Sequence, residues 1–226
     1  MKKFNFVQGL PDLKSLNTDE STGERFYISP NGKKLPSVTT VLGHFKKKAM
    51  IEWRNRVGHE EANKISTRAS MRGTKFHNMM ESYLRNEEGF LDSVMPDMKQ
   101  SFRDMQETLD LIDNIHYIEG QMFSEKLGVA GRTDCIAEFG NVLSIIDFKT
   151  SIKQKKEEWI DNYLEQGTAY ALMYEELVGN PIDQIVIIIA TDDSDRPQVF
   201  VKDKNQYIQN LLEKIHLYKQ ERTLCT

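Results

Sequence analysis

The chain has 226 residues, of which 39% are hydrophobic and 28% charged, and its 30 Lys+Arg against 34 Asp+Glu give a formal net charge of 30 − 34 = −4. This composition is ordinary for a globular protein with a buried core, and no apolar run approaches the ~18 residues that span a bilayer. Two cysteines, Cys135 and Cys225, are too few for a disulfide framework, a structural zinc site or an iron–sulfur cluster. The N-terminus also lacks the apolar segment of a secretory signal. We therefore expect an intracellular protein with no membrane partner.

The N-terminal half is expected to hold one hairpin followed by helices. Residues 1–22 are polar and contain several turn-forming residues, which predicts an irregular arm. Two short runs, 26–28 and 33–35, flank a Ser-Pro-Asn-Gly turn and predict a β-hairpin. After this hairpin the apolar spacing is helical in three stretches, which are 38–45, 49–84 with a break near 66–67, and 96–115.

The C-terminal half combines strands and helices. Its apolar runs predict three consecutive strands, a helix, two further strands and a last helix, at 117–123, 129–139, 142–148, 157–176, 185–190, 199–201 and 205–219. We therefore predict a mixed α/β or α+β fold with an antiparallel meander at its centre. It is expected to be one domain, residues 1–226, made of the arm 1–22, a hairpin and helical portion 23–115, and a sheet with flanking helices 116–226.

Two neighbouring strands carry the residues with the clearest chemistry. Asp134 lies in the first strand, whereas Asp147 and Lys149 lie in the next, two residues apart and hence on one face, with Phe148 on the other. Pairing through the Gly-Asn turn between the strands brings the two aspartates to one end of the sheet. Two close carboxylates repel each other unless a cation joins them, and hard oxygen ligands suit Mg²⁺ or Mn²⁺. From these two strands alone, another interpretation is equally good: Asp134 is a turn residue, and Asp147 forms a surface ion pair with Lys149.

This pattern resembles the PD-(D/E)XK nuclease superfamily, whose motif is an acidic residue, a short hairpin and then Asp/Glu-x-Lys. Two further stretches resemble its RecB-type members. Gln166 and Tyr170 match a Q-x-x-x-Y element on the helix after the Asp-x-Lys strand, where a spacing of four places both on one face. Upstream, an R-G-T-x-x-H-x-x-x-E helix is matched by Arg72, Thr74, His77 and Glu81. The resemblance covers roughly residues 35–174, in the family's order of elements.

The resemblance implies a nuclease core with a helical N-terminal half, nearest to the RecB-like exonucleases without an iron–sulfur cluster, such as the mitochondrial genome maintenance exonuclease and its phage relatives. It implies metal-assisted hydrolysis of a phosphodiester with Mg²⁺ or Mn²⁺. The implied metal ligands are His77, Asp134, Asp147 and the backbone carbonyl of Phe148, with Glu81 and Glu119 as further candidates. Lys149 is implied to position the attacking water, and Gln166 and Tyr170 to orient Lys149 or the cleaved strand.

A DNA substrate needs positive charge near these carboxylates, and the net charge of the chain does not report where that charge lies. The candidate DNA contacts are Lys47, Trp53, Arg54, Arg72, Thr74, Lys153, Lys155 and Lys156. Phe76 and Trp159 are additional rings that could stack on bases of a single strand. For any single basic run a solvated surface is the simpler interpretation, and Trp159 is equally well explained as a core residue.

We therefore expect a monomeric DNA exonuclease that acts on single-stranded ends in replication, repair or recombination, in a phage-encoded or bacterial setting. Its helical N-terminal half is expected to form an arch or channel that admits only a free single strand, and replication or recombination proteins are candidate partners. Two alternatives stay open at this point. One is a structure-specific endonuclease of the same fold, and the other is a catalytically silent protein that binds nucleic acid.

Overall fold

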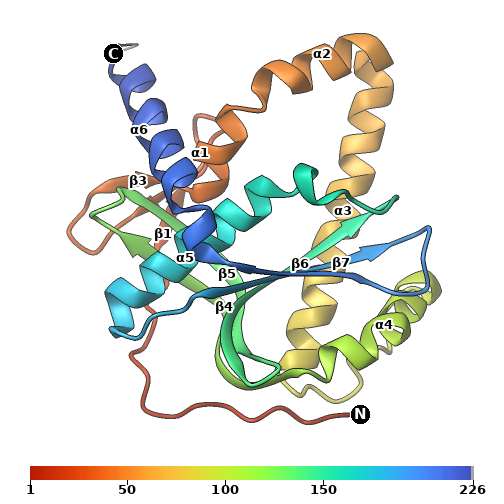
Figure 1. Cartoon of the computed structure of the whole chain (residues 1–226). Helices are drawn as coiled ribbons and strands as arrows, with labels where there is room; N and C mark the ends of the chain where they lie inside the picture. The colour runs from red at the N-terminus through yellow and green to blue at the C-terminus, as the bar shows by residue number, and fades with distance from the viewer. Residues whose placement is uncertain (225–226) are drawn as a thin grey trace.

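A computed structural model describes residues 1–224 of the chain as a mixed α/β fold (Figure 1), which confirms the predicted class. The N-terminal part contains a small three-stranded sheet and four helices, which are β1 (Asn17–Asp19), β2 (Phe26–Ile28), β3 (Lys34–Pro36), α1 (Val38–His44), α2 (Lys47–Val57), α3 (His59–Leu84) and α4 (Pro96–Leu109). The C-terminal part contains β4 (Ile112–Ser124), β5 (Val129–Phe139), β6 (Val142–Ser151), the short turn η1 (Glu157–Trp159), α5 (Asp161–Val178), β7 (Gln184–Thr191), β8 (Gln198–Asp203), η2 (Lys204–Gln206) and α6 (Ile208–Leu224).

The central sheet has five strands in the order β4-β5-β6-β7-β8. β4, β5 and β6 are antiparallel neighbours, as the predicted meander requires. Gly140 and Asn141 form the β5–β6 turn with φ of 60° and 66°, because a two-residue hairpin of this kind needs left-handed backbone at both positions. β6 and β7 are parallel and joined by the α5 crossover, and β8 pairs antiparallel with β7 at the far edge.

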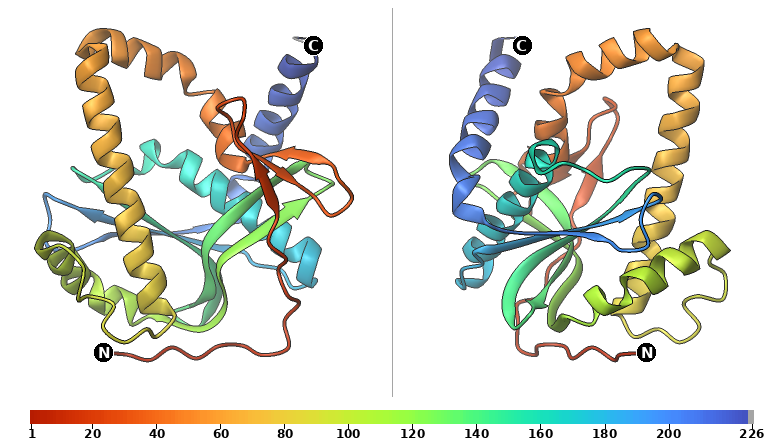
Figure 2. Two further views of the ribbon diagram at one scale, coloured as in Figure 1. Left: turned by 180° about the vertical axis from the view of Figure 1, so that it is seen from behind. Right: turned by 45° about the vertical axis from the view of Figure 1, so that its right-hand side comes forward.

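Helices cover both faces of this sheet (Figures 1 and 2). Alternate residues of each central strand serve opposite faces, so Ile145 and Ile187 pack with α1, α5 and α6. Ile146 and Ile188 pack on the other face with α4 and the C-terminal half of α3. Within residues 1–224 no helix has the length and apolar character that crossing a bilayer requires.

The N-terminal half of the long helical stretch projects away from the sheet. In Figures 1 and 2, α1, α2 and α3 form an arch whose top is α2. α2 has no buried residue, and in α3 only Ala62 is buried before Phe76. The predicted helix break near 66–67 is wrong, because the chain turns at Gly58, whose φ of +93° is a conformation that other residues rarely adopt.

Two other predicted boundaries are corrected by the structure. The helix expected to reach residue 115 ends at Leu109, since Ile112 and Ile115 belong to β4 and are buried in the core. Their spacing of three is typical of one face of a helix. In the structure both residues are buried from a strand, because β4 has an irregularity at this point, where Asn114 has φ of +45°. The arm, residues 1–22, contains β1 and is anchored by Phe4, which is buried.

Candidate active site

The site lies where β5 and β6 separate. Backbone pairing of these strands ends at Cys135 and Ile146, so the next pair in register would be Asp134 and Asp147. At this point a side chain takes the place of a backbone carbonyl of β5, because Oδ2 of Asp134 accepts a hydrogen bond from the backbone N–H of Phe148 at 2.8 Å. A strand residue points its N–H and C=O to the same side, so the carbonyl of Phe148 also faces this gap. The fork therefore directs one carboxylate and one carbonyl into the same space.

Asp147 and Lys149 form a buried pair beside this fork. Nζ of Lys149 lies 2.5 Å from Oδ2 of Asp147, whose side chain is only 2% exposed. Burial raises the pKa of Asp147 to about 6, against the opposing influence of the Lys149 charge. Burial alone would lower the pKa of Lys149. The charges of Asp147 and Asp134 outweigh this effect of burial, so the pKa of Lys149 is raised and its ammonium stays protonated. The ammonium also lies 5.2 Å from the ring centroid of Tyr163, a neighbour that the sequence motifs did not indicate.

His77 reaches the fork from α3. Its Nδ1 is 3.3 Å from Oδ2 of Asp134. Burial opposes a charge on the imidazole, but the hydrogen bond and the charge of Asp134 are stronger and raise the pKa of His77. The preceding residue, Phe76, is 1% exposed and fixes this part of α3 to the sheet. Sequence analysis suggested that Phe76 could stack on bases; this is wrong, because the ring is enclosed in the core.

Glu119 approaches the same point from β4. The β4–β5 register places it opposite Asp134, and its φ of +54° is uncommon for a residue with a side chain. Burial raises the pKa of Glu119, and the charge of Asp134 adds to that rise. One ligand atom each from His77, Glu119 and Asp134 lie within 4.8 Å of one another. These three residues therefore have the spacing of a metal site.

The other candidate ligands lie close by but are engaged differently. Glu81 lines the same cleft, where its Oε1 is 3.0 Å from a guanidinium nitrogen of Arg85. Asp147 is not part of the trio, since its carboxylate is buried against Lys149. Oδ2 of Asp147 is paired with the Lys149 ammonium, whereas Oδ1 is buried without a hydrogen-bond partner. A buried carboxylate oxygen without a partner fits a site that receives a cation, and carboxylates with one imidazole suit Mn²⁺ or Mg²⁺.

Gln166 and Tyr170 come from α5 and line the cleft. Nε2 of Gln166 donates to the Tyr170 hydroxyl at 3.1 Å, as their spacing of four on one helix allows. Tyr170 itself is buried, with 2% of its surface exposed. Its ring lies against the backbone of Gly131, where an added Cβ would be 2.6 Å from Cε1 of the ring. The glycine in β5 therefore creates the space that Tyr170 occupies.

Replacing Gly131 with alanine should displace Tyr170 and destabilise the chain by about 1–3 kcal/mol, because a buried aromatic ring has little room to move. The nuclease activity that the sequence resemblance implies should fall further than the loss of folded protein explains. Chemical denaturation and initial rates measure the two effects. Gly43→Ala in α1 is the matched control, since no atom lies within 4 Å of its added Cβ. Equal effects of both substitutions would contradict the packing argument.

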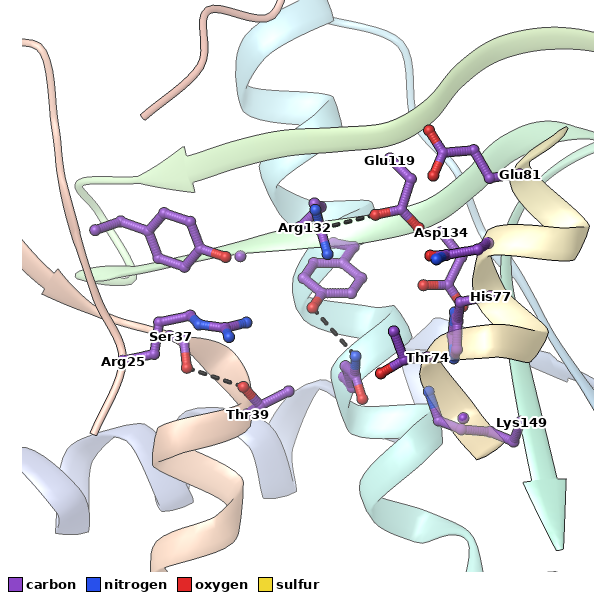
Figure 3. Close-up of a pocket in the computed structure, with 16 residues that line it drawn as sticks. Arg25, Ser37, Thr39, Thr74, His77, Glu81, Glu119, Arg132, Asp134 and Lys149 are labelled. Carbon is purple, nitrogen blue, oxygen red and sulfur yellow. Dashed lines mark hydrogen bonds and ion pairs between the residues drawn. The ribbon is translucent and has the colours of Figure 1, made fainter. Parts of the chain in front are cut away.

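One cleft of about 460 Å³ is lined by His77, Glu81, Glu119, Asp134, Lys149, Gln166 and Tyr170 (Figure 3). His77, Glu81, Glu119 and Asp134 gather on one wall, which is built from α3, β4 and β5. The opposite wall carries side chains that the sequence motifs did not single out, namely Arg25, Ser37 and Thr39. Another such residue is Arg132, which pairs with Glu119. Ser37, Thr39 and Arg132 lie within the stretch that carries the resemblance, residues 35–174, but the sequence motifs assign them no role in the site.

The candidate DNA contacts do not all lie at this cleft. Thr74 lines it, whereas Arg72 makes two hydrogen bonds to Asp192 and lines a separate depression. On the arch, Lys47 pairs with Glu24 at 2.8 Å, Arg54 with Asn63, and Trp53 is half-buried.

The loop after β6 is the most exposed of the predicted DNA contacts. Lys153 and Lys156 are exposed, and Lys155 is half-buried with its backbone N–H donating to Gln198 at 2.6 Å. Trp159 is 55% exposed, which excludes the core interpretation, and Nζ of Lys156 lies 5.4 Å from its ring centroid. This loop directly follows the strand of Lys149, but its lysines are not among the residues that line the cleft.

Comparison with known proteins finds relatives that are named as exonucleases. The chain is 28% identical over 142 residues to the Homo sapiens protein named Mitochondrial genome maintenance exonuclease 1, in an alignment that covers 58% of this chain. The Mus musculus protein of the same name is 27% identical over 129 residues, or 54% of this chain. The chain is similar to mitochondrial genome maintenance exonuclease 1. This similarity confirms the predicted resemblance to exonucleases of that group.

The chain spans only part of the curated relatives it matches. The alignments cover 41% of mitochondrial genome maintenance exonuclease 1 from Homo sapiens and 38% of the protein from Mus musculus. No model of a protein family matches the chain. A solved structure described as "Crystal structure of SSO0001" aligns with 80% of this chain and 74% of its own at 13% identity, with a TM-score of 0.40.

Proposed function

We propose that this chain is a metal-dependent DNA exonuclease that hydrolyses phosphodiester bonds at single-stranded ends. The observation that carries the proposal is the meeting of His77, Glu119 and Asp134 within 4.8 Å beside the buried Lys149–Asp147 pair. The similarity to proteins named as genome maintenance exonucleases supports the reaction class and a role in DNA replication, repair or recombination. We propose that the chain acts as one domain and as a monomer.

The proposed chemistry divides between a cation and the chain's own residues. A bound Mg²⁺ or Mn²⁺ lowers the pKa of water and stabilises charge on the phosphate. Its proposed ligands are His77, Asp134, Asp147 and the carbonyl of Phe148, with Glu119, and Glu81 as a further candidate. Lys149 is held by Asp147 and orients the attacking water through its N–H donors.

The remaining predicted residues are assigned mainly to the substrate. Gln166 and Tyr170 orient Lys149 or the cleaved strand, and Thr74 offers a hydroxyl donor to a phosphate. The cations of the loop after β6, Lys153, Lys155 and Lys156, neutralise neighbouring phosphates, and Trp159 offers a ring on which a base stacks. Arg72, Trp53, Arg54 and Lys47 extend the proposed path toward the arch.

The requirement for a free end is tested by comparing two forms of one substrate. The arch of α1, α2 and α3 supports threading of a single strand, so linear single-stranded DNA should be degraded while the same sequence as a closed circle stays intact. The measurement is gel analysis of both forms at equal enzyme concentration, with double-stranded circles and linear duplexes as further lanes. Equal cleavage of circle and line would instead support the structure-specific endonuclease of the same fold.

Removing divalent cations should stop hydrolysis without unfolding the chain. Chelation with EDTA takes away the activation of water, which residues of this chain do not replace, and we expect the rate on linear DNA to fall below detection. Adding excess Mg²⁺ or Mn²⁺ should restore it, whereas circular dichroism should be unchanged throughout. Activity that persists in EDTA would contradict a metal-dependent mechanism, and DNA binding without cleavage in either metal would favour the catalytically silent alternative.

A further inference from the structure

Arg132 stands beside the proposed metal site, yet the motif residues do not include it. It lies on β5 two residues before Asp134, so both side chains leave the same face of the strand. A guanidinium nitrogen of Arg132 is 2.7 Å from Oε2 of Glu119, and 52% of the arginine side chain is exposed. Glu119 is the one ion-pair partner of Arg132 among residues 1–224. An exposed arginine is therefore held in place by a mostly buried carboxylate.

The carboxylate that holds Arg132 is the same one that completes the trio with His77 and Asp134. Glu119 has two candidate positive partners, a guanidinium on its outer side and a divalent cation on its inner side. Two cations that share one carboxylate repel each other, and the dication carries the larger charge. Binding of the dication should therefore weaken the hold of Glu119 on Arg132.

A released Arg132 would face space that DNA can occupy. Arg132 and Glu119 line the active-site cleft and also a second cleft of about 540 Å³ between the N-terminal arm and β4. The two clefts thus meet at this ion pair. Guanidinium groups bind phosphate oxygens through two parallel hydrogen bonds, which makes a backbone phosphate the natural alternative partner.

We propose that Arg132 is the resident counter-ion of Glu119, and that cation binding releases it to hold a phosphate of the DNA strand. This inference rests on the proposed function, because it assigns a ligand to the same site. Metal and DNA then strengthen each other's binding, and Arg132 carries part of that coupling. Arg132 is thereby a positioning residue for the substrate.

The test measures two affinities that do not depend on cleavage. Mn²⁺ affinity is obtained by calorimetry on the protein alone. Affinity for a labelled linear single-stranded oligonucleotide is obtained by fluorescence anisotropy, once in EDTA and once in Ca²⁺, with a gel to verify that the oligonucleotide stays intact. The variants are Arg132→Met, Glu119→Gln and both together, and circular dichroism verifies their folding. Arg132→Gln takes the place of Arg132→Met if the latter does not fold.

Arg132→Met should bind Mn²⁺ about 3- to 10-fold more tightly than the wild type, because Glu119 loses its competing partner. Its DNA affinity should be unchanged in EDTA and about 5- to 10-fold weaker in Ca²⁺, within the usual range of coupling between two sites. Glu119→Gln should bind DNA more tightly in EDTA, since the arginine is free, and the double variant should lose that gain.

The matched control is Arg25→Met on the opposite wall, whose guanidinium pairs with Glu20 at 2.5 Å. It removes the same charge from the same cleft without touching Glu119, and it should change Mn²⁺ affinity less than twofold. An equal gain in both arginine variants would reduce the effect to general electrostatics and overturn the proposal. So would a loss of DNA affinity in Arg132→Met that is the same in EDTA and in Ca²⁺. A wild type that binds neither Mn²⁺ nor DNA would instead overturn the proposed function.

Discussion

Replacing Asp147 with asparagine should slow DNA hydrolysis by about 10³-fold or more while DNA binding stays measurable. The amide keeps the shape of the carboxylate but carries no charge, so it binds a dication more weakly and forms no ion pair with the Lys149 ammonium, which lies 2.5 Å from the wild-type carboxylate. Cation binding and the fixing of Lys149 act on the same reacting water. Their loss together should therefore raise the activation free energy by more than the loss of one hydrogen bond does. Single-turnover rates on end-labelled linear DNA, with anisotropy for binding, measure both outcomes.

The control for this substitution is Asp19→Asn. Asp19 pairs with Lys34 at 2.6 Å, nearly the distance of the active-site pair, but both residues lie in the small N-terminal sheet and on its surface. Its loss should leave the hydrolysis rate unchanged, because exposed pairs contribute little and no reacting group is near. Wild-type cleavage in Asp147→Asn would refute the site assignment. Loss of cleavage in both variants would point to a general charge effect.

Replacing Phe76 with alanine should destabilise the chain by about 3–5 kcal/mol and lower activity in the molecules that remain folded. Phe76 is 1% exposed and packs with Met79 and Met80 against the sheet, so its removal leaves a cavity. Along α3, Phe76 is also the residue at which the helix enters the core after its exposed N-terminal half. The adjoining His77, whose ring lies 6.5 Å from that of Phe76 in an edge-to-face arrangement, should then lose its fixed position.

Met71→Ala on the same helix separates burial from helix formation. Met71 is 57% exposed, so the same truncation should change the free energy of unfolding by no more than about 0.5 kcal/mol. Urea denaturation followed by circular dichroism gives both values, and Mn²⁺ affinity reports on the position of His77. Similar destabilisation by the two substitutions would mean that α3 is not anchored at Phe76.

Much of the C-terminal half follows from local sequence. Strand periodicity and the Gly-Asn turn correctly predicted the β5–β6 hairpin, because side chains alternate in a strand and few residue pairs accept left-handed backbone. The same periodicity placed Asp147 and Lys149 on one face, where the structure joins them. Helical spacing likewise predicted that Gln166 and Tyr170 meet, as they do at 3.1 Å.

Boundaries and burial were less predictable. A spacing of three between Ile112 and Ile115 fits a helix and an irregular strand equally well, and only pairing with β5 selects the strand. The ring of Phe76 has the chemistry of a base-stacking residue, but its environment decides that it is core. Gly58 was the better signal for the helix break, since positive φ is favoured by glycine.

Motif spacing predicted which residues gather at the proposed site, because it fixes the faces of strands and helices on which they lie. The tertiary structure sets how they meet. It brings His77 of α3 and Glu119 of β4 to Asp134, it buries the Lys149–Asp147 pair, and it adds Arg132 as the partner of Glu119. These contacts join segments far apart in the chain, and their distances depend on how helices pack on the sheet, which local patterns do not specify.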